Sequence, residues 1–314
     1  MKTLWVKRTD SSSYFPSGFA ELEKQALEAV AGVRYLGASD PVVTSGPVCL
    51  LTNTHTNLAK WQNFSQQIEL ILHPNSGMDN LASDLKHWHV PTVLGNPIRA
   101  QAVTEWVLSC LFQHFASIHH HSVWPKGRQW ERSLLSDQKV LMVGQGHVGI
   151  LVKRALENLG ISPRVHDPFL GLAGELNGAW DVVILVASSN PTNQEIISEQ
   201  FLATLPAQAV IINPARADLI SESALRKFFK RNPQARAYLD VHRQEPYAAN
   251  YWQDCPQVIS TPHIAGVWSG LISAMLQFEV QILSSWMTTD RAQFEAQYAA
   301  LLAQTRLTDK GWYR

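Results

Sequence analysis

Three side chains with complementary chemistry follow predicted strands in the second half of the chain: Arg216 after one strand, Glu245 after the next and His263 after the last. A guanidinium can bind a carboxylate through two parallel hydrogen bonds. A histidine can give up or take up a proton near neutral pH, and a carboxylate can orient its ring. Because the carboxyl ends of parallel strands share the edge where open α/β sheets bind ligands, we expect these three to lie together. They could bind a 2-oxo acid through its carboxylate and protonate its carbonyl oxygen as a hydride arrives.

A glycine-rich turn lies between a predicted buried strand at 139–143 and a predicted helix at 148–159. Its residues are Gly144, Gln145, Gly146, His147, Val148 and Gly149. Gly144 permits the tight turn, Gly146 the close approach of a pyrophosphate, and Gly149 close packing of helix on strand. The start of the helix supplies backbone N–H groups for phosphates. The turn therefore predicts a dinucleotide site.

An acidic residue, Asp167, ends the next predicted strand. Its carboxylate can accept hydrogen bonds from both ribose hydroxyls and would repel a 2′-phosphate. Residues 168–171 contain no arginine or lysine that could hold such a phosphate. The cofactor is therefore expected to be NAD rather than NADP. The alternative that Asp167 caps a loop stays open at this point.

The order and spacing of these motifs, over residues 74–266, resemble the D-isomer-specific 2-hydroxyacid dehydrogenases, in particular glyoxylate and hydroxypyruvate reductases. The resemblance implies that Arg216 binds the substrate and that His263 is the general acid and base, paired with Glu245. It also implies a substrate loop at 75–80. The residues of that loop whose backbone N–H groups would bind the substrate carboxylate are Ser76 and Gly77.

The same resemblance implies further contacts with NAD. Thr104 would lie near the nicotinamide, and Asp240 would contact the nicotinamide carboxamide. The other cofactor contacts that it implies, besides the glycine-rich turn and Asp167, are Ser188, Asn190, Asn213, Pro214, Ala215, His263 and Gly266.

The chain also departs from the pattern of the family. Ser188 and Asn190 stand where the family usually has Pro and Thr, and Ala217 with Asp218 replaces the usual Gly after the arginine. Asp218 puts a carboxylate two residues from Arg216, where it could weaken the hold of the arginine on an anionic substrate. These departures bear on the substrate more than on the cofactor.

The elements that position these residues predict two doubly wound α/β domains with parallel sheets. We expect a flavodoxin-like substrate domain formed by residues 1–96 and 269–314. A Rossmann-type NAD-binding domain, residues 97–268, is expected to be inserted into it. The predicted strands of the first domain are 4–6, 48–51 and 68–72, and those of the second, after 139–143, are 164–166, 181–187, 209–213, 237–239 and 257–260.

Two long helical patterns complete the expected architecture. One runs from Arg99 to His121 and the other from Ser269 to Met287. The family resemblance implies a homodimer built largely on the first of these helices.

Composition excludes several classes of partner. The 26 basic and 26 acidic residues cancel, and no dense basic cluster offers a surface for nucleic acid. We expect no membrane association, because there is neither an apolar leader nor a run of roughly 18 apolar residues. The three cysteines have no disulfide or metal-ligand spacing, so no metal and a cytoplasmic location are expected.

Two other functions are compatible with the scaffold. A non-catalytic, NAD-sensing regulatory protein is one, although the presence of Arg216, Glu245 and His263 together argues against it. A formate or phosphite dehydrogenase is the other. Formate dehydrogenases on this scaffold lack the Glu–His pair, whereas phosphite oxidation stays open. The substrate also stays open, because glyoxylate, hydroxypyruvate, pyruvate and larger 2-oxo acids share the same carboxylate and carbonyl.

Overall fold

The computed structural model describes residues 3–11, 15–42, 46–85, 88–118, 120, 122–124, 126–127, 132–174 and 176–308. The chain divides into two compact units. Unit 1 consists of Met1–Arg99 and Trp268–Arg314, and unit 2 is Ala100–Val267. The inserted domain expected from the sequence was 97–268. In both units an α/β fold with a parallel sheet is present, as predicted.

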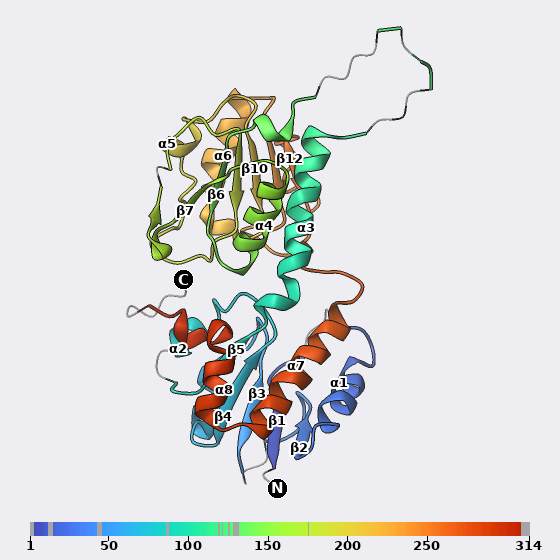
Figure 1. Ribbon diagram of the computed structural model, residues 1–314, viewed down its shortest axis with the longest axis vertical. Coiled ribbons are helices and arrows are strands. Elements are labelled where there is room, and N and C mark those ends of the chain that lie inside the picture. Colours follow the sequence, from blue (N-terminus) through green and yellow to red (C-terminus); the bar gives the residue numbers. More distant parts are fainter. Residues whose placement is uncertain are drawn as a thin grey trace. The chain divides into compact units, whose positions relative to one another are not determined.

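Unit 1 contains a five-stranded, all-parallel sheet in the order β2-β1-β3-β4-β5 (Figure 1). Its strands are β1 (Leu4–Arg8), β2 (Val33–Leu36), β3 (Val48–Leu51), β4 (Ile68–His73) and β5 (Thr92–Leu94). After β1 the chain adds β2 on one side of it, and then crosses back to add β3, β4 and β5 in turn on the other side. The sheet is therefore doubly wound. The sequence did not predict β2 or β5, because neither contains the run of three or more consecutive apolar residues that marks β1, β3 and β4.

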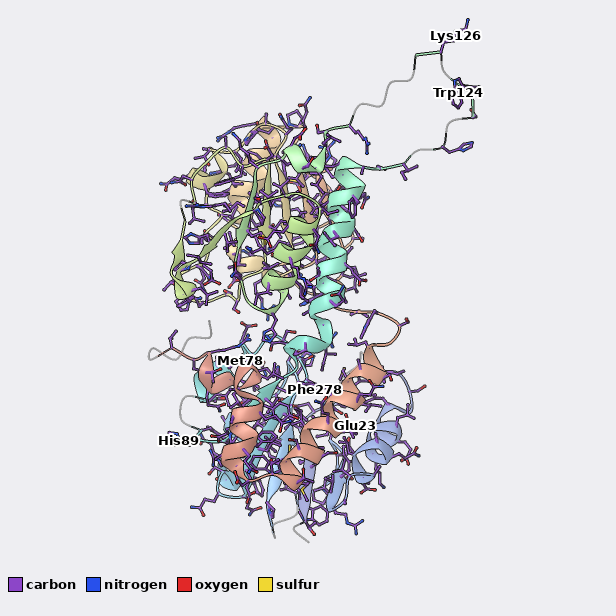
Figure 2. All side chains as sticks on the ribbon, in the orientation of Figure 1. Glu23, Met78, His89, Trp124, Lys126 and Phe278 are labelled. Carbon is purple, nitrogen blue, oxygen red and sulfur yellow. The ribbon has the colours of Figure 1, made fainter. Side chains whose placement is uncertain are left out.

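Successive side chains of a strand point to opposite faces of the sheet. Both faces of this sheet carry apolar side chains, and helices cover both. Leu51 of β3 packs against α1 (Phe19–Glu28), α7 (Leu271–Thr288) and α8 (Arg291–Gln297). Leu50 packs on the other face, against α2 (Ala82–Leu85) and the 3₁₀ helix η1 (Leu58–Phe64). Figure 2 places Glu23 on α1 and Phe278 on α7.

Unit 2 contains a seven-stranded sheet in the order β12-β11-β10-β9-β6-β7-β8. Its strands are β6 (Val140–Val143), β7 (Arg164–Asp167), β8 (Leu172–Ala173), β9 (Val182–Leu185), β10 (Val210–Asn213), β11 (Arg236–Leu239) and β12 (Val258–Ser260). Every pairing is parallel except that of β7 with β8, a short hairpin edge that the sequence did not predict. The order reverses between β6 and β9, which places the switch point of the sheet at the glycine-rich turn.

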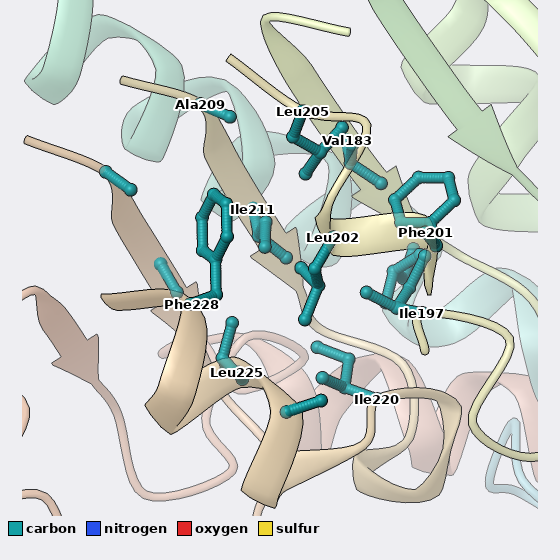
Figure 3. Close-up of a cluster of buried hydrophobic side chains, with 14 of the residues drawn as sticks. Val183, Ile197, Phe201, Leu202, Leu205, Ala209, Ile211, Ile220, Leu225 and Phe228 are labelled. Carbon is teal, nitrogen blue, oxygen red and sulfur yellow. The ribbon is translucent and has the colours of Figure 1, made fainter. Parts of the chain in front are cut away.

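Two helical layers bury the faces of the second sheet. Its helices are α3 (Asn96–Phe115), α4 (His147–Asn158), α5 (Glu199–Leu202) and α6 (Glu222–Arg231). Val183 and Ile211 face α5 and α6, in the cluster that Figure 3 shows. Ile184 and Ile212 face the opposite way, against α3 and α4. These buried strands hold the loops at their carboxyl ends in fixed positions.

The prediction that one helix reaches His121 is wrong, because α3 ends at Phe115. Val107, Leu111 and Phe115 form its buried face, whereas Ile118 is 87% exposed. Helices in proteins are stabilised mainly by packing of an apolar face, and beyond Phe115 that packing is lost. No helix in the described ranges combines the length and the apolar content needed to cross a bilayer.

Candidate active site

A histidine and a carboxylate meet after the last strands of unit 2. Nδ1 of His263 lies 2.8 Å from Oε2 of Glu245. The other carboxylate oxygen, Oε1, accepts a hydrogen bond from the backbone N–H of His242 at 2.7 Å. The side chains of His263 and Glu245 are 55% and 35% exposed. The carboxylate is therefore held at both oxygens, and the imidazole remains accessible to a ligand.

The loop that carries His263 is organised by Asp240. His263 has a left-handed backbone (φ 56°), which is uncommon for a residue other than glycine and clusters at functional sites. Its N–H donates to the carbonyl oxygen of Asp240 at 2.9 Å. The buried Asp240 carboxylate accepts hydrogen bonds from the hydroxyl of Thr261 and the N–H groups of Ile264 and Ala265. Burial raises the pKa of Asp240, and these hydrogen bonds oppose the rise. Its implied contact with a nicotinamide carboxamide stays a prediction.

His242 links the two catalytic loops, a role that the sequence did not reveal. Its ring is buried, and the indole N–H of Trp252 donates to Nδ1 at 3.1 Å. An indole N–H can only donate, so the proton of this imidazole sits on Nε2, which donates to the carbonyl oxygen of Thr261 at 3.1 Å. His242 lies within the 239–246 segment, but nothing in the spacing of that segment marks it.

Arg216 lies in the loop after β10, which is braced by Asn213. The buried amide of Asn213 donates to the carbonyl oxygen of Arg216 at 2.8 Å and accepts from the N–H of Ala215 at 3.0 Å. The guanidinium is half-buried, and Nη1 donates to the carbonyl oxygen of Ala215. The carboxylate of Asp218 accepts a hydrogen bond from the hydroxyl of Ser189 at 2.5 Å. The loops after β9 and β10 are therefore tied together.

The loop after β9 is also closed by its own polar groups. The side-chain oxygen of the buried Asn190 accepts hydrogen bonds from the N–H and the hydroxyl of Thr192. The amide of Asn193 donates to the carbonyl oxygen of Ser188 at 2.8 Å. Asn190, which stands where the family usually has Thr, thus builds a defined turn with Thr192 at this point.

The glycine-rich turn has the geometry that a pyrophosphate requires. Gly144 has φ 98°, and a Cβ there would lie 2.6 Å from the backbone of Ala187. A Cβ on Gly149 would lie 2.5 Å from the carbonyl oxygen of Gly144. Gly146 is exposed, and a Cβ on it would meet nothing within 4 Å. Two glycines are therefore required by packing, and the third borders open space that a dinucleotide could occupy.

Asp167 holds this turn, since its Oδ2 accepts the N–H of Gln145 at 2.8 Å. The loop-capping alternative is thus present in the structure, and ribose binding stays a prediction. Among the described residues no side chain caps α4, and the N–H groups of its first turn have no acceptors inside the helix. His147 and Val148 open this helix. An uncapped helix start beside an open glycine fits the phosphates of NAD.

The carboxyl edge of this parallel sheet collects most of the predicted site. The predicted residues at or after the carboxyl ends of β6, β7, β9, β10, β11 and β12 are Gly144–Gly149, Asp167, Ser188, Asn190, Asn213, Pro214, Ala215, Arg216, Asp240, Glu245, His263 and Gly266. Thr104 lies elsewhere, buried in α3 with its hydroxyl donating to the carbonyl oxygen of Ala100.

Ser76 and Gly77 belong to unit 1, in the turn after β4. Both are half-exposed. Within the described part of the chain, their backbone N–H groups donate no hydrogen bond. Two adjacent N–H groups without acceptors can bind a carboxylate, which is the role that the sequence predicts for them.

The known proteins to which this chain is similar include dehydrogenases. Residues 108–265 match the family model described as "D-isomer specific 2-hydroxyacid dehydrogenase, NAD binding domain". D-3-phosphoglycerate dehydrogenase of Bacillus subtilis is 26% identical over 223 residues, which are 64% of this chain but only 42% of that protein. Erythronate-4-phosphate dehydrogenase of Acinetobacter baylyi is 26% identical over 278 residues, covering 85% of this chain and 72% of that protein.

Solved structures show the same fold over nearly the whole chain. D-lactate dehydrogenase from Aquifex aeolicus, complexed with NAD and lactic acid, superposes with a TM-score of 0.68 at 14% identity, covering 95% of this chain and 98% of that one. A D-isomer specific 2-hydroxyacid dehydrogenase from Xanthobacter autotrophicus, in complex with NADPH and MES, has a TM-score of 0.68 at 21% identity, covering 92% and 99%.

Proposed function

The chain belongs to the D-isomer-specific 2-hydroxyacid dehydrogenase family, and from this premise we propose that it interconverts a small 2-oxo acid and the corresponding D-2-hydroxy acid with NAD. The observation that carries the proposal is the 2.8 Å contact between His263 and Glu245. This pair lies at the carboxyl edge of the sheet that also carries Arg216 and the glycine-rich turn. An acid, a cation and a nucleotide-binding turn are the groups that the reaction needs.

His263 acts as the acid in the reductive direction. Its Nδ1 is committed to Glu245, so Nε2 donates the proton to the carbonyl oxygen of the substrate. Arg216 binds the substrate carboxylate through its forked donors. The N–H groups of Ser76 and Gly77 are likewise proposed to bind a carboxylate. When bound, NADH supplies the hydride. In the oxidative direction the neutral imidazole takes the hydroxyl proton, and Glu245 stabilises the charge that develops on the ring.

The physiological form is proposed to be a cytoplasmic homodimer. Three large apolar side chains beyond the end of α3 are mostly exposed: Ile118 (87%), Val123 (74%) and Trp124 (84%), the last labelled in Figure 2. Exposed apolar side chains that gather in one segment are typical of an interface. The three cysteines are buried and unpaired, which is typical of proteins in a reducing compartment.

A screen of NADH consumption with glyoxylate, hydroxypyruvate, pyruvate and larger 2-oxo acids tests the activity. We expect at least one acid to be reduced. Because the carboxylate of Asp167 is expected to bind the ribose hydroxyls and to repel a 2′-phosphate, NADH should be preferred over NADPH by about tenfold or more. NADH binding in calorimetry without turnover of any acid would instead indicate an NAD-sensing protein. Reduction of NAD by phosphite or formate, with no 2-oxo acid reduced, would indicate different hydride chemistry.

A further inference from the structure

A fully buried histidine, His73, supports the turn that carries Ser76 and Gly77. It is the last residue of β4. Its Nε2 lies 2.8 Å from the carbonyl oxygen of Gly77, and its Nδ1 lies 2.8 Å from the hydroxyl of Thr52, the residue after β3. A carbonyl oxygen can only accept, so Nε2 carries the proton. Nδ1 then accepts from Thr52, and these two contacts fix a single tautomer.

This imidazole stays neutral under working conditions. Burial lowers the pKa of His73 to about 4, although the hydrogen bond to Gly77 and the nearby Asp79 act in the opposite direction. The Nε2–H donor is therefore present, and the ring uncharged, at every pH at which a dehydrogenase of this kind would be assayed.

The rest of the turn is tied by its carbonyl groups as well. The N–H of Gly95 donates to the carbonyl oxygens of His73 at 2.7 Å and of Asn75 at 3.2 Å. A Cβ on Gly95 would lie 2.4 Å from the backbone of Pro74, so the end of β5 packs directly against the turn. These contacts engage carbonyl oxygens and leave the N–H groups of Ser76 and Gly77 without acceptors among the described residues.

We propose that His73 is a positioning residue for substrate binding: by holding the carbonyl group of Gly77, it keeps the N–H groups of Ser76 and Gly77 aimed at the substrate carboxylate. The inference rests on the proposed function of this turn. A glycine without such a restraint samples many backbone conformations. Binding of a carboxylate would then have to order the turn, which would weaken the affinity. His73 removes that requirement before the substrate arrives.

Two substitutions at position 73 separate the hydrogen bond from the packing. His73→Phe keeps an aromatic ring of similar size but donates nothing, whereas His73→Gln keeps an amide donor that can reach the position of Nε2. We expect His73→Phe to raise the KM for the preferred 2-oxo acid about tenfold, the typical effect of one lost hydrogen bond, with little change in kcat. The inhibition constant of oxamate, a non-reducible analogue, should rise in parallel. His73→Gln should recover most of the loss.

Dissociation constants for NADH and thermal unfolding curves serve as controls, because a merely structural defect would reduce active enzyme without raising KM. An unchanged KM in a folded His73→Phe variant would overturn the inference and leave the proposed function intact. Failure of the wild type to reduce any 2-oxo acid would overturn both. If His73→Phe does not fold, His73→Asn decides. Its shorter amide can keep the contact with Thr52 but cannot reach the carbonyl oxygen of Gly77, so KM should rise as in His73→Phe, and an unchanged KM overturns the inference.

Discussion

The arrangement of Glu245 leaves His263 one free nitrogen. The carboxylate binds Nδ1 through Oε2 and is itself held by the N–H of His242 through Oε1. The contact with Glu245 therefore sets the ring orientation, and Nε2 belongs to an imidazole side chain that is 55% exposed. A flexible histidine would have to be oriented anew in every catalytic cycle, at a cost in rate.

Replacement of His263 by alanine should reduce turnover by roughly 100-fold or more in both directions, because a general acid and base is lost. In the wild type, reduction should slow as pH rises and oxidation as pH falls, since the two directions need opposite protonation states. Glu245→Gln should keep some activity but lower kcat in both directions, because the amide no longer stabilises the charge that develops on the ring. Steady-state kinetics over pH, with NADH binding as control, measure these effects. Full activity of His263→Ala would contradict the mechanism.

Arg216→Ala should raise the KM for 2-oxo acids and lower kcat, because the substrate carboxylate loses its forked donors. NADH affinity should hardly change. Arg231→Ala removes a 68% exposed arginine at the end of α6 and is a matched control that should leave both constants unchanged. Loss of cofactor binding with intact substrate kinetics would reassign Arg216 to the nucleotide site.

At the scale of the elements, the glycines of the turn between β6 and α4 are needed for different reasons. Some are required by packing, and one by ligand binding. Gly144 and Gly149 have no room for a side chain, whereas Gly146 borders open space. The first two are therefore required by the fold itself. The third is required only if a ligand approaches the backbone there.

The substitutions Gly149→Ala and Gly146→Ala test this division. Gly149→Ala should lower the melting temperature and weaken NADH binding, because its Cβ would lie 2.5 Å from a backbone oxygen. Gly146→Ala should leave the melting temperature unchanged and weaken only NADH binding, since its Cβ meets nothing in the protein. Thermal unfolding and calorimetry measure the two effects. Unchanged NADH affinity in Gly146→Ala would remove the turn from the cofactor site.

The helices α1 and α7 are joined to β1 by a buried ionic cluster. Arg8 of β1 contacts Glu23 of α1 and Glu279 of α7, and all three are buried. Two carboxylates facing one guanidinium leave an excess negative charge when both are ionised. Burial raises the pKa of Glu279 far above its ordinary value of 4.5, and Oε2 of Glu279 has no hydrogen-bond partner within the described residues.

Stability should therefore fall as pH rises. A raised carboxyl pKa means that the folded chain holds a proton that the unfolded chain releases above about pH 4.5, so the stabilising contribution is lost with rising pH. In Glu279→Gln the free energy of unfolding should depend less on pH. The variant should therefore become more stable relative to the wild type as pH increases. The window from pH 6.5 to about 8 is best suited, because His73 is mostly neutral there in both states and the pKa of Glu279 in the folded chain is about 8. Unfolding by urea at several pH values measures the slope, and equal slopes in both proteins would contradict the assignment.

At the scale of the whole molecule, large apolar side chains beyond α3 are left mostly uncovered by the described part of the chain. Ile118 and Trp124 are exposed to 87% and 84%. Such side chains cost solvation free energy unless a second chain covers them. The proposed homodimer is the assembly that would bury them.

Sedimentation velocity should therefore find the wild type as a dimer and Trp124→Ser shifted towards monomer. Ile150→Ser, at a 55% exposed position on α4, is the matched control and should remain dimeric. A dimer of unchanged stability in Trp124→Ser would place the interface elsewhere.

The sequence alone determined the family, the fold class and the identity of the candidate catalytic residues. Glycine-rich turns and buried parallel strands have local requirements that each leave a recognisable pattern. The glycine-rich turn and the segments that carry Arg216, Glu245 and His263 could therefore be found without coordinates. The 2.8 Å contact of Glu245 with His263 agrees with the pairing that the resemblance implied.

Only the tertiary structure decided what holds these residues in place. The roles of Asp240 and His242 depend on hydrogen bonds between loops that are distant in the sequence. That of His73 depends on its burial and on its contact with Thr52 as well as with nearby Gly77, and no spacing encodes these contacts. The end of α3 and the short strands β2, β5 and β8 were likewise decided by packing. Short elements have weak propensities, so their limits are set by whichever neighbours bury them.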